Sequence, residues 1–187
     1  IKKNNPLTDK NKKSFLADYQ NNCAKIIKKN SWDSYNLQKC LDRARELQIS
    51  NNFDQWISLY NPFIEVVKFI KYIEKKGCQI GIITTKGKLF TEKILEKIDI
   101  NPDFLYGYES GSKPEIITNL INDFTIIGFL EDRLKTLLNI VNNSQTSAVP
   151  CYLADWGYLK EEDRKNLPKT IKLLKLNDLN NKLANFD

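Results

Sequence analysis

The sequence predicts an α/β protein built on a parallel sheet, and three observations lead to this expectation. From residue 61 onward, strand-like apolar runs alternate with stretches of helical periodicity, joined by short links. The strand-like runs are continuously apolar and rich in β-branched residues, as in strands covered on both faces. The composition, with 41% hydrophobic and 28% charged residues, is that of a globular protein. We therefore expect a sheet with helices on both of its faces.

The first third of the chain contains no strand-like run and is expected to be helical. Apolar residues at helical spacing predict helices over residues 14–29, 34–47 and 51–59. The Lys- and Asn-rich residues 1–13 predict a loop. The aromatic residues expected in the core of this part are Tyr19, Trp32, Tyr35 and Trp56. We accordingly divide the chain into a helical segment, residues 1–60, and an α/β core, residues 61–187.

In the α/β core, each element has its own local signal. Pro62 and Pro114 stand where helices begin, and Lys75-Lys76-Gly77 is a typical helix end. The run Q-I-G-I-I-T predicts a buried parallel strand, and Cys78 and Cys151 lie beside apolar runs as expected of core residues. Helices are expected over 62–76, 89–98, 114–121, 134–141 and 178–184. Strands are expected over 79–84, 103–106, 124–130, 148–154 and 171–174.

Charge and cysteine content favour an intracellular protein without a nucleic-acid motif. The formal net charge is +6, with many of the lysines in the first 29 residues, but no motif organises them together with aromatic residues. The four cysteines form no CxxC pair and the chain has no His, which does not favour a zinc site. Free thiols without a signal peptide are typical of the cytoplasm. No apolar run is long enough to span a membrane.

Polar side chains follow the first four of the five predicted strands of the core. They are Thr84, Thr85 and Lys86, then Ser110 to Lys113, then Glu131, Asp132 and Arg133, and finally Asp155 to Gly157. Ligands of parallel α/β sheets bind outside the carboxyl ends of the strands, so we expect these groups to converge on one edge. Hydroxyl, ammonium and paired carboxylate groups together suit a phosphate bound with Mg²⁺.

At these positions the sequence resembles the haloacid-dehalogenase-like (HAD) hydrolases. Three strings look like the second, third and fourth motifs of that superfamily, in the same order. They are I-I-T-T-K, then S-K-P, then F-L-E-D-R-L-K-T-L. The helix before the second motif is resembled by N-P-F-I-E-V-V-K-F-I-K-Y-I-E-K-K-G. The strand and turn after the fourth motif are resembled by C-Y-L-A-D-W-G-Y-L. The resemblance spans about residues 14–176 and is closest to a cyanobacterial branch with T-T-K, E-D-R and W-G-Y-L signatures.

The resemblance implies a three-layer Rossmann-like parallel sheet with a helical cap, and a role for each matching residue. Thr84 would hold a phosphoryl oxygen, with Thr85 as a less favoured candidate for substrate binding. Lys113 would neutralise the phosphoryl group, and Asp132 with Glu131 would position Mg²⁺. Arg133 would either bind substrate anions or pair with Glu131, and we favour the pairing. Asp155 and Trp156 are expected to form a turn that ends a strand.

Two departures from the superfamily pattern are evident. The chain has no Asp-x-Asp, the motif whose first Asp attacks phosphorus and whose second acts as acid and base. We expect the strand that carries this motif to lie upstream of Ile1, before the cap. In many members another Asp also lies four positions after the first Asp of the fourth motif, and here the residue four positions after Asp132 is Thr136.

The expected function is Mg²⁺-dependent hydrolysis of a small phosphorylated metabolite through an aspartyl-phosphate. Dehalogenase and phosphonatase chemistry also occur on the implied fold and remain open. The main alternative is a non-catalytic HAD-like module that binds a phosphorylated ligand or a protein. A third reading is nucleic-acid binding through the basic helical segment, which a salt-dependent shift of generic DNA would support. Neither the substrate nor the oligomeric state follows from the sequence.

Overall fold

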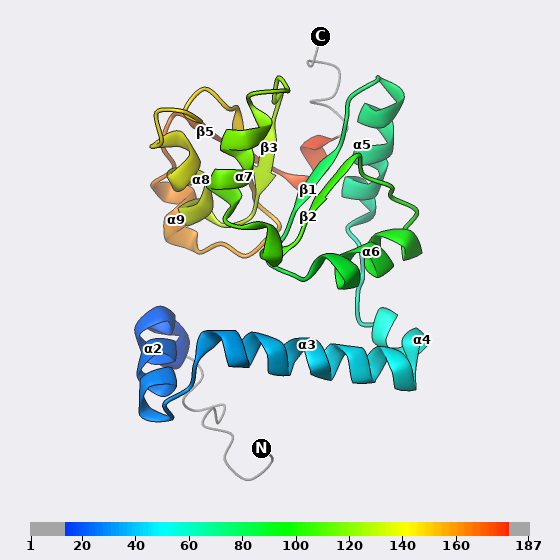
Figure 1. The fold of residues 1–187 in the computed structure, drawn as a ribbon. Coiled ribbons are helices and arrows are strands. Elements are labelled where there is room, and N and C mark those ends of the chain that lie inside the picture. Colours follow the sequence, from blue (N-terminus) through cyan, green and yellow to red (C-terminus); the bar gives the residue numbers. More distant parts are fainter. Residues whose placement is uncertain (1–13, 180–187) are drawn as a thin grey trace. The chain divides into compact units, whose positions relative to one another are not determined.

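The computed structural model describes residues 14–179, which form two compact units (Figure 1). The chain divides between Trp56 and Ile57, close to the expected boundary between residues 60 and 61. The loop expected over residues 1–13, and most of the helix expected over 178–184, lie outside the described residues. No helix between residues 14 and 179 is both long enough and apolar enough to cross a membrane.

The opening part of the chain is helical, as predicted. Its helices are α2 (Tyr19–Lys29), α3 (Ser34–Asn51) and α4 (Phe53–Ile57). The helix expected over 14–29 is interrupted at Asp18, where the backbone leaves helical geometry with φ −131° and ψ 53°. Helix α3 begins after Asp33, whose carboxylate accepts a hydrogen bond from Asn36 N at 2.9 Å.

The prediction of an aromatic core in this part is correct only for Trp56. The Trp56 side chain is 2% exposed, whereas Trp32 is 50% exposed and Tyr19 and Tyr35 are also exposed. Among the described residues, neither α2 nor α3 contains a buried residue. Helical periodicity therefore predicted that these segments are helical, but it could not show whether another element covers their apolar residues.

The second unit alternates helices with parallel strands. Its helices are α5 (Ile64–Lys75), α6 (Lys88–Lys97), α7 (Lys113–Leu120), α8 (Leu134–Val141) and α9 (Glu161–Lys165). Its strands are β1 (Gly81–Ile83), β2 (Phe104–Tyr106), β3 (Phe129–Glu131), β4 (Cys151–Ala154) and β5 (Ile171–Leu174). Two 3₁₀ turns complete it, η1 (Tyr108–Ser110) and η2 (Leu176–Asp178). Every strand pair between residues 14 and 179 is parallel, which confirms the α/β prediction.

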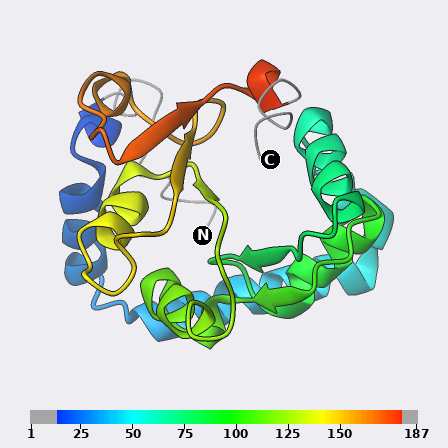
Figure 2. The same ribbon diagram turned by 90° about the horizontal axis from the view of Figure 1, so that it is seen from above.

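The strands form two sheets rather than one, with orders β1-β2 and β3-β4-β5. In the view of Figure 2, β1 rather than β2 lies on the side nearer β3. Within the described part of the chain, β1 and β3 are each paired on one side only. Both are shorter than predicted: three of residues 79–84 form β1, and only two of residues 124–130 belong to β3, which extends to Glu131.

Burial of β1 is also lower than predicted. Gly81 is exposed and Ile82 and Ile83 are only half-buried, whereas the sequence predicted a strand covered on both faces. Cys78, expected in the core, is half-buried as well. The missing second neighbour of β1 explains this exposure, because strands at the centre of a parallel sheet are shielded on every side.

The core of this unit lies between the three-stranded sheet and helices α7 and α8. Its buried residues are Ile117, Leu137, Ile140, Val149, Cys151, Leu153 and Ile171. Ile83 of β1 and Phe129 of β3 pack against this cluster, so the two sheets share one core. Cys151 was correctly predicted as a core residue, and burial raises the pKa of its thiol to about 11.

Candidate functional site

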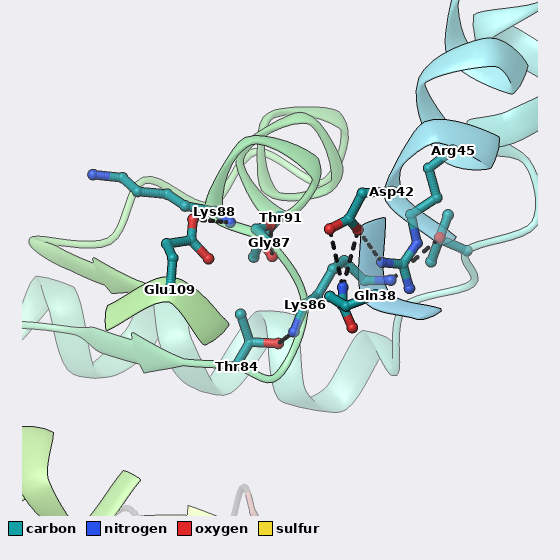
Figure 3. A network of polar contacts seen from close by, with 10 residues as sticks. Gln38, Asp42, Arg45, Thr84, Lys86, Gly87, Lys88, Thr91 and Glu109 are labelled. Carbon is teal, nitrogen blue, oxygen red and sulfur yellow. Dashed lines mark hydrogen bonds and ion pairs between the residues drawn. The ribbon is translucent and has the colours of Figure 1, made fainter. Parts of the chain in front are cut away.

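The loop after β1 places Thr84 at the end of the ladder. Thr84 N donates to Tyr106 O at 2.9 Å, which extends the β1–β2 pairing by one residue. Thr84 Oγ1 accepts a hydrogen bond from Lys86 N at 3.1 Å, as Figure 3 shows. The hydroxyl oxygen thus closes its own turn, and the hydroxyl proton remains available to an acceptor such as a phosphoryl oxygen. Thr85 is exposed beside it.

Two neighbours of this loop were missed by the sequence analysis. Tyr60 contacts Lys86, whose ammonium lies 3.3 Å from the phenol oxygen and 4.9 Å from the ring centroid. Glu109 Oε1 accepts a hydrogen bond from Lys88 N at 2.8 Å, so a carboxylate occupies the first turn of α6 (Figure 3). Glu109 follows the end of β2, and this position after a strand is the sequence signal by which it could have been predicted. The second network drawn in Figure 3 joins Gln38, Asp42 and Arg45 within α3.

Lys113 contacts Glu131, which brings the loop after β2 to the end of β3. Lys113 Nζ forms a hydrogen-bonded ion pair with Glu131 Oε2, and the two side chains are 20% and 5% exposed. Lys113 is the first residue of α7, which begins with a capping box in which Ser112 and Glu115 bind each other's backbone. The expected convergence of the residues after β2 and at the end of β3 is therefore present for Lys113 and Glu131.

Burial dominates the electrostatics of Glu131. Loss of solvent raises the pKa of its carboxyl above the ordinary value, the Lys113 ammonium opposes this, and the nearby Asp132 adds to it. Glu131 Oε1 accepts a hydrogen bond from Arg133 N at 3.1 Å, while Oε2 faces Lys113. Both carboxylate oxygens of Glu131 therefore already have a donor from the protein.

The raised pKa of Glu131 predicts how stability depends on pH. The folded protein binds a proton at Glu131 more tightly than the unfolded chain does. The stabilisation that this proton gives to the folded state is complete below pH 4.5 and declines as the pH rises through the raised pKa of Glu131. Glu131→Gln removes the titration. Urea unfolding from about pH 4 to pH 8 should therefore show the wild type losing stability relative to Glu131→Gln as the pH increases. A relative gain by the wild type over this range would contradict the assignment.

Asp132 is held by the turn that follows β4. Asp132 Oδ2 accepts a hydrogen bond from Tyr158 N at 3.0 Å, and residues 155–158 form the turn predicted there. The favoured pairing of the Arg133 side chain with Glu131 is wrong: among residues 14–179, Arg133 contacts Glu131 through its backbone N–H and not through its guanidinium. The Arg133 guanidinium instead lies over the Tyr158 ring, 5.4 Å from its centroid. The planar cation prefers this exposed aromatic face because both Glu131 oxygens are already engaged.

The structure thus joins some of the predicted site residues by contact and leaves others separate. Lys113, Glu131, Asp132 and Arg133 form one connected group at the carboxyl end of β3. In the described chain, the hydrogen bonds of Thr84 stay within its own loop and β2. A surface depression lined by α6 and the loop leading to β2 includes none of the six predicted site residues.

The acidic pair fits Mg²⁺ in part. Mg²⁺ keeps several waters and takes one or two protein carboxylates together with substrate phosphate. Among residues 14–179, Asp132 Oδ1 has no hydrogen-bond donor, whereas both oxygens of Glu131 do. The same residues contain no group of three or more acidic or thiol side chains arranged to hold a metal ion. Asp132 therefore fits as a direct ligand, and Glu131 fits better as the partner of Lys113.

Comparisons of the chain with family models, with curated proteins and with solved structures found no match. The class that the fold itself defines is an α/β protein with parallel sheets.

Proposed function

We propose that the protein is a Mg²⁺-dependent phosphohydrolase of the HAD type, acting on a small phosphorylated metabolite in the cytoplasm. The observation that carries this proposal is the contact of Lys113 with Glu131, beside Asp132, at the carboxyl end of a parallel strand. An ammonium group and two acids gathered at this edge suit the charge of a transferring phosphoryl group. The resemblance of three sequence motifs to the HAD superfamily agrees with the same chemistry.

Each residue of the group has a defined role in the proposed reaction. Lys113 neutralises charge on the phosphoryl oxygens, and Glu131 keeps its ammonium in place. The hydroxyl of Thr84 donates a hydrogen bond to a phosphoryl oxygen. Asp132 Oδ1 holds Mg²⁺, which when bound supplies positive charge to the phosphate. Thr85 and Arg133, both exposed, bind the remainder of the substrate.

The nucleophile in this proposal is an Asp on a strand that the present sequence does not contain. The division of the strands supports its placement, because β1 and β3 both offer an unpaired edge among the described residues. One further parallel strand between them would join both sheets into one three-layer Rossmann-like fold, and its carboxyl end would lie between Thr84 and Glu131. Attack of its carboxylate on phosphorus forms an aspartyl-phosphate and breaks the bond to the leaving oxygen, which takes a proton from the second Asp of the same motif and leaves as an alcohol. Water then releases inorganic phosphate and restores the carboxylate.

The helices before residue 60 form the cap of the proposed enzyme. A helical cap excludes water from the reacting phosphate and selects the substrate. The exposed apolar residues of α3, namely Leu37, Leu41 and Leu47, are available for contacts with a substrate or with another surface.

A phosphatase panel tests the proposed function. The protein extended by its native upstream segment should release phosphate from at least one small phosphorylated metabolite, and chelation of Mg²⁺ should stop the release. Absence of turnover across sugar phosphates, nucleotides and phosphorylated acids would overturn the proposal of a phosphatase.

A non-catalytic module that binds a phosphorylated ligand is the second candidate, favoured by the absence of Asp-x-Asp from the sequence. The same panel separates the two functions. Saturable binding of a phosphorylated compound, without turnover and with an upstream segment that lacks Asp-x-Asp, would favour the module.

A further inference from the structure

The turn that follows β4, residues 155–158, packs closely against Asp132. Tyr158 N donates to Asp132 Oδ2 at 3.0 Å. A Cβ atom on Gly157 would lie only 2.9 Å from both Asp132 Cγ and Oδ2, and closer still to Asp132 Cβ. A carbon atom at these distances from carbon or oxygen overlaps their van der Waals surfaces, so only glycine leaves room for the Asp132 side chain in this position.

Arg164 fixes the start of this turn. Its Nε donates to Asp155 Oδ1 at 2.5 Å and its Nη2 to Asp155 O at 3.1 Å, so one guanidinium binds both side chain and backbone. Asp155 N donates to Leu174 O at 2.9 Å, and Gly157 N to Ala154 O at 3.2 Å. The turn is thereby tied to α9, to the end of β5 and to β4.

These contacts determine which carboxylate oxygen of Asp132 is available to bind a ligand. The turn uses Oδ2, and the absence of a side chain at Gly157 lets the carboxylate lie against the backbone. Oδ1 is then the oxygen without a hydrogen-bond donor among residues 14–179. A carboxylate held by one oxygen keeps a single rotamer and presents the other oxygen in a fixed direction.

We propose that residues 155–158 orient Asp132, with Gly157 and Arg164 as positioning residues that never touch the ligand themselves. Gly157 provides the space, the Tyr158 amide provides the hydrogen bond, and Arg164 keeps the turn in place from the next helix. The inference deepens the proposed function, on which it depends for the identity of the ligand at Oδ1. The orientation of Asp132 is a property of the chain alone and can be measured without any ligand.

Amide hydrogen exchange, measured by NMR, tests the orientation. In the wild type the Tyr158 amide should exchange about tenfold more slowly than in Asp132→Ala, which lacks the acceptor. Gly157→Ala and Arg164→Gln should lose most of this protection, whereas core amides of β4 stay protected. Lys165→Gln is the matched control, because Lys165 lies on the same helix and pairs only with Glu161, at 3.8 Å, among the described residues. Wild-type protection in both Gly157→Ala and Arg164→Gln would overturn the proposal.

Binding of Mn²⁺, followed by electron paramagnetic resonance as a probe for the Mg²⁺ site, separates this inference from the proposed function. We expect Gly157→Ala and Arg164→Gln to bind Mn²⁺ about tenfold more weakly than the wild type and Lys165→Gln. Unchanged affinity in both variants would overturn the positioning role. A wild type that binds no Mn²⁺ would overturn the metal role of Asp132 and the function proposed for Oδ1, while the exchange experiment still decides the orientation.

Discussion

Replacing Asp132 by Asn is expected to lower kcat/KM for the phosphorylated substrate by about 100-fold or more. Asparagine has nearly the same shape, and its amide oxygen can still accept the hydrogen bond from Tyr158 N. The substitution therefore removes the negative charge and leaves the contact with the turn. Because Mg²⁺ needs anionic oxygen ligands, we also expect Mn²⁺ binding to be lost from this variant.

Asp123→Asn is the control for this substitution. Asp123 is an exposed acid after α7, so its replacement changes the net charge equally at a position away from the candidate site. Thermal unfolding of both variants shows whether either change affects the fold. Equal turnover by the wild type and Asp132→Asn would contradict the assignment of Asp132 as the metal ligand.

Replacing Lys113 by Met should destabilise the protein by about 3 kcal/mol at neutral pH. The substitution keeps a long side chain at the start of α7 but leaves Glu131, which is only 5% exposed, without its cationic partner. A buried carboxylate without a counter-charge must either stay ionised at high cost or take up a proton. Urea unfolding measures the loss, which should become smaller as the pH is lowered toward 4 because protonated Glu131 no longer needs the ammonium.

The double variant Lys113→Met with Glu131→Gln provides the decisive comparison. Removing both charges leaves no uncompensated ion, so we expect the double variant to recover much of the stability lost in Lys113→Met. The single variant Glu131→Gln completes the cycle. If the free energies of the two single substitutions simply add in the double variant, the ion pair contributes nothing and the central contact of the candidate site is not formed in solution.

Local signals predicted much of this fold, and the failures occurred where the outcome depended on distant partners. Residues 134–141 and 171–174 form the predicted elements with identical bounds, because helical and strand periodicity are read within a few residues. Strand β3 was predicted to begin at residue 124 but begins five residues later, at Phe129, because the sequence pattern does not reveal where a neighbouring strand is available for pairing. Helix α9 was missed because its five residues are all charged and show no apolar period.

The candidate site shows the same division. The association of Lys113 with Glu131 was predictable, since the carboxyl ends of parallel strands meet at one edge. The close packing of Asp132 against Gly157 was not predictable, because it depends on the path of a loop that follows a different strand. A glycine directly after the predicted strand-ending turn was the only signal available. The stacking of Arg133 on Tyr158 was likewise beyond the sequence, which suggested an acidic partner instead.

The separation of the strands into two groups has a consequence for how the second unit assembles. Each ladder joins strands that follow one another along the chain, β1 with β2, β3 with β4, and β4 with β5. Each pair is joined by one crossover that contains a helix, so the paired strands are close in sequence and their pairing costs less loop-closure entropy than pairing across the two groups. Between the groups, side-chain packing such as that of Ile83 acts without backbone pairing. Because the β1–β2 group has a single ladder and contacts the shared core only through side chains, we expect it to open before the β3-β4-β5 group when the protein is stressed.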